Sequence, residues 1–105
     1  MAKYKHYVYR IYINDEVYVG SHSTKNINDN YFCSSPEVNK LRDAGLPYNR
    51  QILYFFDNVH DKFIFESVMI YKIGTLNKHK ITNKNAYLKK VNYLLNKYPE
   101  LNMFI

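Results

Sequence analysis

The chain has 105 residues, 47% of them hydrophobic and 17% aromatic, so its length and composition favour one folded domain over a disordered chain. The absence of a long apolar run and of a signal-peptide core favours a cytoplasmic protein without a membrane partner, and the single cysteine excludes an internal disulfide and a cysteine-based zinc site. The net charge is +6, and residues 1–71 balance eight basic against eight acidic side chains, so the whole excess lies in residues 72–105.

Turn and capping residues divide the chain into short elements. The expected elements are strands at 7–13 and 17–20, a loop at 21–33, a helix from Ser34 to Gly45, a strand at 50–56, a helix at 59–73, a loop at 75–85 and a helix at 86–97. This order predicts an α+β fold in which three helices flank a small, three-stranded, mainly antiparallel sheet.

Capping residues set the helix limits. Ser34-Ser-Pro-Glu37 supplies a cap, a proline in the first turn and an acid three residues after the cap. Asp57 or Asn58 is expected to cap the second helix, and Asn85 the third.

The two N-terminal strands predict a hairpin with a tight turn at Asn14-Asp15. With a two-residue loop, Ile11 faces Tyr18, and Tyr9 lies diagonally from Tyr18 on the same face. His22 follows the second strand. We therefore expect two phenols and an imidazole near one patch of the sheet, where they can handle protons.

Tyr7-Val8-Tyr9 and Tyr18-Val19-Gly20 resemble the signature of the GIY-YIG nuclease superfamily, a hairpin with one tyrosine in each strand and a glycine ending the second. Tyr7 stands where the family has glycine. The resemblance continues through residues 20–31 and 49–57, where the chain is similar to small phage-encoded members. It implies a core at 7–74, followed by a basic loop and helix at 75–105 within one domain, 1–105.

Glu66 lies in a helical segment, residues 63–71, that is apolar almost all round. A carboxylate buried there needs an ion pair, a proton or a metal ion. The resemblance implies that Glu66 binds the catalytic divalent cation, and one carboxylate suffices for Mg²⁺ or Mn²⁺ that retains water ligands. A structural ion pair and a solvent-exposed position remain the alternatives.

The resemblance implies that Tyr9 or Tyr18 takes a proton from the attacking water. A free tyrosine has a pKa of about 10, so such a base needs positive charge nearby. His22, Lys25 and Arg42 are the candidates for that charge. Packing of a sheet face is the alternative role for both phenols.

The resemblance also implies an arginine in the first helix that stabilises charge on the cleaved phosphate. Arg42 is the arginine of that helix, although it lies late in it. Lys25 or Lys40 offers a substitute charge. Arg10 is expected to face away from the tyrosines, whereas Arg50 begins the third strand and is expected to reach a phosphate from the sheet edge.

Clustered positive charge favours a nucleic-acid partner over a merely solvated lysine-rich surface. The residues expected to contact the DNA backbone are Lys25, Lys40, Arg50, Lys78, Lys80, Lys84, Lys89 and Lys90. Backbone contacts alone predict low sequence specificity, which would be higher if the protein dimerises and reads base edges from loops. Cleavage of both strands needs two sites or two events, and a homodimer through the last helix would supply two sites.

These observations predict a metal-dependent DNA endonuclease, in the host cytoplasm if a phage encodes it. One alternative is a catalytically inactive GIY-YIG-like regulator that binds nucleic acid or protein. The other is a small interaction protein whose aromatic surface binds another protein and which has no affinity for DNA.

Overall fold

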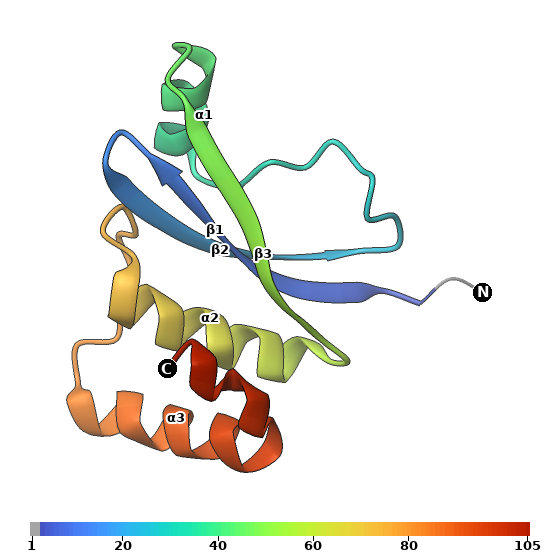
Figure 1. The fold of residues 1–105 in the computed structure, drawn as a ribbon, viewed down its shortest axis with the longest axis vertical. Helices are drawn as coiled ribbons and strands as arrows, with labels where there is room; N and C mark the ends of the chain where they lie inside the picture. The colour runs from blue at the N-terminus through green and yellow to red at the C-terminus, as the bar shows by residue number, and fades with distance from the viewer. Residues whose placement is uncertain (1–2) are drawn as a thin grey trace.

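In a computed structural model, which describes residues 3–105, a three-stranded antiparallel sheet lies between two unequal layers (Figure 1). The elements are β1 (Lys5–Ile13), β2 (Glu16–Thr24), α1 (Pro36–Asp43), β3 (Tyr48–Phe56), α2 (Val59–Ile73), α3 (Lys84–Lys97) and the short 3-10 helix η1 (Pro99–Met103). The strand order is β2-β1-β3, and both pairings are antiparallel. The predicted α+β fold with three helices around the sheet is confirmed.

The hairpin turn is formed by Asn14 and Asp15, whose φ angles of 54° and 60° are both positive. Such a two-residue turn matches the twist of the flanking strands and fixes the register. Ile11 pairs with Tyr18, as predicted. The prediction that the chain enters a loop at residue 21 was wrong, because β2 continues to Thr24 opposite the early residues of β1. Polar side chains do not end a strand whose backbone still has a partner.

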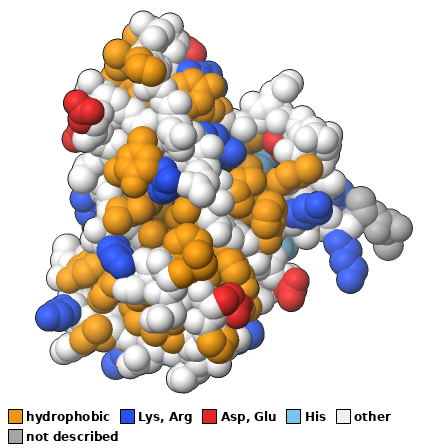
Figure 2. Space-filling view, viewed as in Figure 1, with side chains coloured by type: hydrophobic (Ala, Val, Ile, Leu, Met, Phe, Trp, Pro, Cys, Tyr) orange, Lys and Arg blue, Asp and Glu red, His pale blue; other side chains and the backbone are white. Residues whose placement is uncertain are grey.

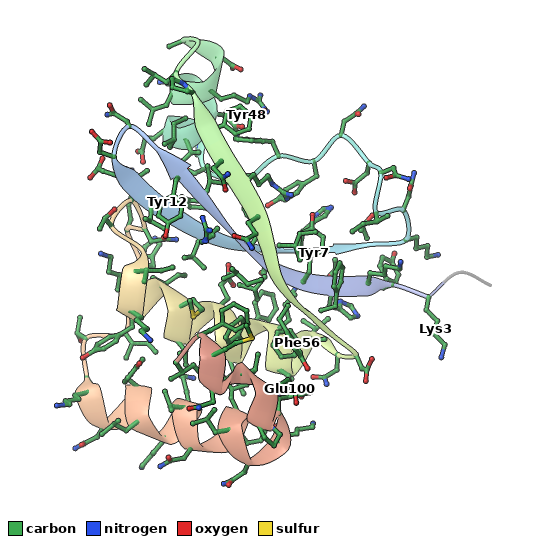
Figure 3. The ribbon with its side chains drawn as sticks, in the orientation of Figure 1. Lys3, Tyr7, Tyr12, Tyr48, Phe56 and Glu100 are labelled. Carbon is green, nitrogen blue, oxygen red and sulfur yellow. The ribbon has the colours of Figure 1, made fainter. Side chains whose placement is uncertain are left out.

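The sheet carries a separate core on each face. On the helical face, Val8 and Val19 pack beneath α2 and α3. On the other face, which we call the tyrosine face, Tyr7 and Tyr9 pack with Cys33 and with α1. Figure 3 labels Tyr7 and, toward the helical layer, Phe56 of the first core. Cys33 is buried and packs in this second core.

The helix limits follow local capping chemistry. The Ser35 hydroxyl accepts a hydrogen bond from the Val38 amide at 3.2 Å, so α1 begins one residue later than predicted. Asn58 caps α2, whose limits match the prediction. Asn83 rather than Asn85 caps α3, which lengthens that helix by two residues at its start.

A buried carboxylate fastens α3 and the chain after it to α2. Asp61 accepts hydrogen bonds from the Tyr93 hydroxyl at 2.7 Å, from the Tyr98 hydroxyl and from the Asn58 amide at 3.0 Å, and Lys97 pairs with it at 2.8 Å. Burial alone would raise the pKa of Asp61, but these partners together hold it well below its usual range.

The outer edge of β2 is covered by the segment that follows α2. The Asn77 side chain accepts from the Val19 amide at 2.9 Å and donates to the Val19 carbonyl at 2.8 Å. Thr75 Oγ1 accepts from the Val17 amide. Side chains thus satisfy backbone groups that a neighbouring strand would otherwise pair.

None of the helices within residues 3–105 has the combined length and apolarity of a membrane-spanning helix.

Candidate active site on the tyrosine face

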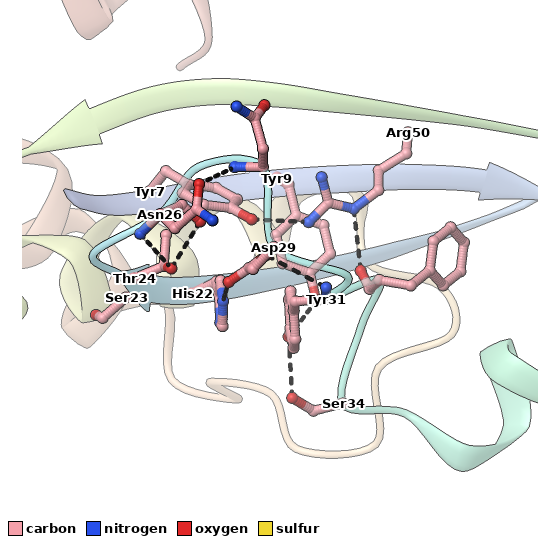
Figure 4. A network of polar contacts seen from close by, with 12 residues as sticks. Tyr7, Tyr9, His22, Ser23, Thr24, Asn26, Asp29, Tyr31, Ser34 and Arg50 are labelled. Atoms are coloured by element: carbon pink, nitrogen blue, oxygen red, sulfur yellow. Dashed lines mark hydrogen bonds and ion pairs between the residues drawn. The ribbon is translucent and has the colours of Figure 1, made fainter. Parts of the chain in front are cut away.

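Three residues predicted for the site lie together on the tyrosine face. The ring centroids of Tyr9 and Tyr18 are 6.3 Å apart. Tyr7 pairs with His22 across the hairpin, and their rings meet edge to face at 5.8 Å. The register explains the grouping, because residues that pair across antiparallel strands share one face. Figure 4 shows Tyr7, Tyr9 and His22 of this cluster.

Tyr31, from the loop after β2, joins the cluster although no role was predicted for it. Its ring stacks on His22 with 3.6 Å between centroids and 3° between planes. Its hydroxyl lies 2.8 Å from the Tyr9 hydroxyl and 3.0 Å from Ser34 Oγ (Figure 4). Tyr31 therefore links the imidazole to the buried phenol of β1.

Asp29 provides the imidazole with a carboxylate partner. Its Oδ2 lies 2.8 Å from His22 Nε2, and this hydrogen bond lowers the pKa of Asp29. The Asp29 Oδ1 atom also accepts from the Tyr31 amide at 3.2 Å, so one carboxylate positions both stacked rings. Asp29 is the only acid within residues 21–36, which is the signal that could have identified it.

Arg50 lies in the edge strand β3, as expected, and its side chain extends over the tyrosine rings. It pairs with Ile11 in the register and so shares the tyrosine face. Its Nη2 donates to the Tyr7 hydroxyl at 3.0 Å, its Nε donates to the Phe32 carbonyl at 3.0 Å, and its Cζ lies 4.3 Å from the Tyr9 ring centroid. Such stacking is favourable for a guanidinium.

Arg42, predicted as the catalytic arginine, lies outside this cluster. Its guanidinium contacts Asp43 at 3.2 Å and stacks 4.5 Å from the Phe32 ring centroid. The guanidinium beside Tyr9 therefore belongs to Arg50. Arg10 points away from the cluster and donates to Gln51, as its alternation with Tyr9 predicts.

Burial dominates the protonation of the phenols. It raises the pKa of Tyr9 well above its usual range, and the hydrogen bond with Tyr31 adds to the effect. Burial also raises the pKa of Tyr18 to about 12. Both side chains are therefore neutral near pH 7, and each keeps a hydroxyl proton that it can donate. His22 is the only imidazole in the cluster, and histidine is the side chain that most often transfers protons in enzymes.

Glu66 lies across β2 from the phenols, on the helical face. It is half-buried; burial raises its pKa, whereas a hydrogen bond with Ser21 and the charge of Lys62 oppose that rise. Within residues 3–105, no Lys, Arg or His nitrogen lies within 4.0 Å of the Glu66 carboxylate, so Glu66 forms no ion pair. Its charge nevertheless helps to raise the pKa of Tyr18, so the two groups lie within electrostatic range.

Lys62 brings a buried positive charge close to Glu66. Its side chain is one helical turn earlier on α2, only 4% of the residue is exposed, and its Nζ donates to Ser23 Oγ at 2.7 Å. Burial lowers the pKa of Lys62, and the charge of Glu66 opposes that effect. His6 Nδ1 lies 2.7 Å from the same hydroxyl.

The fit of a divalent cation to this site rests on Glu66 alone. No three His, Cys, Asp or Glu side chains in the described part of the chain are placed to hold a metal ion together. A half-buried carboxylate without an ion-pair partner nevertheless suits Mg²⁺, which commonly binds proteins through one or two carboxylates and keeps its other ligands as water.

The basic side chains predicted to bind DNA are spread over both layers. Lys25 lies 5.1 Å from the Tyr4 ring centroid, and Lys40 is exposed on α1. Lys78 is paired with Glu37. Within residues 3–105 no ion pair engages the others in the C-terminal segment, Lys80, Lys84, Lys89 and Lys90.

The lysines of α3 lie on the far side of α2 from the sheet (Figure 1). On the face drawn in Figure 2, blue side chains stand singly among apolar ones rather than in one stripe. Two further lysines of the segment are engaged internally: Lys97 by Asp61, and Lys72 by the Phe104 and Ile105 carbonyls. Fewer of the C-terminal lysines are therefore free to contact DNA than the net charge of the sequence indicates.

No family model and no solved structure matches the chain. A similar curated protein is described as "Putative endonuclease segD" of Enterobacteria phage T4. It is 30% identical over 74 residues, which cover 67% of this chain and 33% of that protein. The chain thus spans about a third of the length of the relative it matches.

Proposed function

We propose that this chain is a metal-dependent DNA endonuclease of the GIY-YIG superfamily that hydrolyses phosphodiester bonds with low to moderate sequence specificity. The observation that carries the proposal is the convergence of Tyr9, Tyr18 and His22 with Arg50 on one face of the sheet. The printed description of the phage T4 relative names the same class of activity.

In this proposal His22 accepts the proton of the attacking water. Asp29 holds the imidazole through its 2.8 Å contact and stabilises the imidazolium that forms, as a carboxylate does in other histidine-dependent hydrolases. The stacked Tyr31 ring fixes the plane of the imidazole. The neutral Tyr18 phenol donates a hydrogen bond to a phosphate oxygen.

Arg50 stabilises the negative charge that develops on the phosphate. Its Nε and Nη2 are held by Phe32 and Tyr7, and its Nη1 makes no hydrogen bond to any residue within 3–105. A guanidinium fixed in this way needs little reorganisation as charge develops, which is the basis of electrostatic catalysis. Tyr7, at the position where the family has glycine, is thus a positioning residue for Arg50.

Glu66 would hold the Mg²⁺ or Mn²⁺ ion. When bound, such an ion polarises the scissile phosphate and stabilises the leaving oxygen. The chain's own contribution is a half-buried carboxylate beside Ser21 at the covered edge of β2.

The basic residues predicted from the sequence would contact the DNA backbone. Lys40 is exposed on α1, the helix that packs on the tyrosine face, and would contact phosphates next to the cleaved bond. Lys25, beside Tyr4, would contact phosphates farther along the duplex. Lys80, Lys84, Lys89 and Lys90 would contact a more distant stretch, or the DNA of the second protomer in a homodimer. Such contacts position the duplex without reading its bases.

Nicking of supercoiled plasmid DNA tests the proposal. With Mg²⁺ or Mn²⁺ the wild-type protein is expected to convert supercoiled to open-circular DNA, and Glu66→Gln to lower the rate about 100-fold or more. Asp43→Asn removes an equal charge from an exposed acid on α1 and is expected to leave the rate unchanged. Wild-type protein that nicks with neither metal would contradict the proposal.

A second candidate is a catalytically inactive regulator that keeps the fold. The complete burial of Tyr9, whose hydroxyl is bonded to Tyr31, favours it, because a family phenol that cannot reach substrate has no catalytic role. Salt-sensitive DNA binding without cleavage would identify a nucleic-acid-binding regulator, and no DNA affinity at all would identify a protein-binding one.

A further inference from the structure

A cavity of about 330 Å³ opens beside Tyr18. Its walls include Tyr18 of β2, Ile70 of α2 and Leu76 of the loop that follows α2. Ser35, Glu37 and Lys78 stand among its polar lining residues. The cavity is therefore built where four segments of the fold meet at the edge of the sheet.

The lining suits a planar heterocycle with polar edges. Aliphatic and aromatic walls favour a flat ring, and every nucleobase has a face that stacks on an aromatic side chain. The hydroxyl, carboxylate and ammonium of Ser35, Glu37 and Lys78 offer donors and acceptors for its edge atoms. A free anion is a poorer occupant, because the Glu37 carboxylate lies beside the only ammonium in the lining.

The position of the cavity connects it to the proposed site. Tyr18 belongs both to the tyrosine cluster and to the cavity wall. Ile70 lies one helical turn after Glu66 on α2, so the cavity adjoins the proposed metal-binding carboxylate as well. A base held there would keep the phosphate of its own nucleotide near both groups.

We propose that this cavity binds one unstacked nucleobase of the DNA substrate, next to the phosphodiester bond that is cleaved. This inference rests on the proposed function. Extruding a base costs free energy that is smallest where the base is unpaired. The protein would therefore prefer duplexes with a bulge, mismatch or single-stranded junction, a structural preference that backbone contacts alone do not give.

The ion pair between Lys78 and Glu37 fits this role. It joins the loop after α2 to α1 across the lining of the cavity. Both side chains are largely exposed, so the pair contributes little to stability. Opening it would let the two walls part as the base enters.

The test compares binding to two labelled duplexes that differ by one unpaired nucleotide, with EDTA present so that cleavage is absent. The wild-type protein is expected to bind the bulged duplex about ten-fold more tightly, which corresponds to the binding free energy gained by stacking one base on an aromatic side chain. Leu76→Phe narrows the cavity and is expected to remove this preference while leaving affinity for the paired duplex unchanged. The matched control is Leu46→Phe, which narrows a different cavity near the hairpin turn and is expected to keep the preference.

A second measurement does not depend on any variant folding. Titration of the ¹⁵N-labelled wild-type protein with each deoxynucleoside monophosphate is expected to shift the amides of Tyr18, Leu76 and Lys78. Equal affinity for the two duplexes, or amide shifts confined to other surfaces, would overturn the inference. A bulge preference without plasmid nicking would uphold the base site and reject the endonuclease, whereas nicking without that preference would do the reverse.

Discussion

The Tyr9 ring crosses directly over Gly20, and a Cβ on Gly20 would lie 2.5 Å from the Tyr9 Cζ atom. The two residues are paired across the hairpin. Gly20 does not have a positive φ, so its backbone conformation does not require glycine. Glycine is required there because the Tyr9 ring occupies the space that a side chain would need. A tyrosine in the first strand and a glycine at this point of the second are therefore one packing unit.

Gly20→Ala is expected to lower the free energy of unfolding by about 1–3 kcal/mol, because an added methyl group in a filled core forces neighbours apart. In a Tyr9→Leu background the same substitution should cost much less, since the ring that it meets is gone. A double-mutant cycle by urea denaturation measures the difference.

Gly45→Ala is the matched control. Gly45 has a φ of 87°, and nothing lies within 4 Å of a Cβ placed on it, so its cost is backbone strain of about 1 kcal/mol. That cost should be the same whichever residue occupies position 9. Equal costs of Gly20→Ala in the two backgrounds would contradict the packing argument.

Arg50→Lys is expected to lower the nicking rate about 100-fold, because an ammonium cannot reproduce the fork that is held by Tyr7 and Phe32. Arg42→Lys, which alters a guanidinium paired with exposed Asp43, should leave the rate within a factor of two or so. Rates are compared at equal folded fraction, checked by thermal unfolding. The opposite ranking would return the catalytic role to Arg42.

The pH dependence of nicking distinguishes the two kinds of base. If Tyr18, with a pKa of about 12, accepted the proton, the rate would rise about ten-fold per pH unit throughout pH 6–9. The proposal assigns the proton to His22, so this rise should be absent, and Tyr18→Phe should lower the rate without changing the shape of the profile. A ten-fold rise per pH unit that disappears in Tyr18→Phe would assign the base to the phenol.

Lys62→Met is expected to strengthen Mn²⁺ binding roughly ten-fold, because it removes a buried positive charge one helical turn from Glu66. Methionine has a similar length, and replacing a buried charge by an apolar group need not destabilise the fold. Electron paramagnetic resonance of free Mn²⁺ measures the affinity. Lys72→Met is the control on the same helix, and weaker binding by Lys62→Met would show that the ammonium does not compete with the cation.

Asp61→Asn is expected to lower the free energy of unfolding by about 2 kcal/mol or more, because several buried donors lose their charged acceptor. Asp43→Asn, at an exposed ion pair, should cost about 0.5 kcal/mol or less.

The lowered pKa of Asp61 also sets a pH dependence. The folded state binds the Asp61 proton less readily than the unfolded state does, so this stabilisation is complete above pH ~4 and is lost as the pH falls further. Urea denaturation between pH 2.5 and 7 should show a smaller acid loss in Asp61→Asn than in the wild type. An equal loss in both would place the acid sensitivity elsewhere.

Local sequence signals predicted the elements whose limits are set by turn and capping residues. The two-residue turn fixed the pairing of Ile11 with Tyr18, and the limits of α2 followed from Asn58 and Gly74. Contacts between distant segments could not be predicted in this way. Arg50 meets Tyr7 across 43 residues of sequence, and that contact depends on how β3 is aligned with β1.

The same limit applies to the loop after β2. Tyr31 and Asp29 join His22 only because residues 24–31 fold back on the tyrosine face through short polar bonds such as Thr24 Oγ1 to the Asn26 carbonyl. Such loop geometry leaves no periodic pattern in the sequence. The extension of β2 to Thr24 was missed for a related reason, since its pairing partner lies 19 positions earlier, at Lys5.

The Asn77 side chain is bonded to both backbone groups of Val19, so the two edges of the sheet differ in their ability to pair with a further strand. Among the described residues, no backbone hydrogen bond outside the sheet itself involves the outer margin of β3. A strand from another chain can therefore add to the sheet along β3 but not beside Val19 of β2, where a side chain already takes the place of a neighbouring strand.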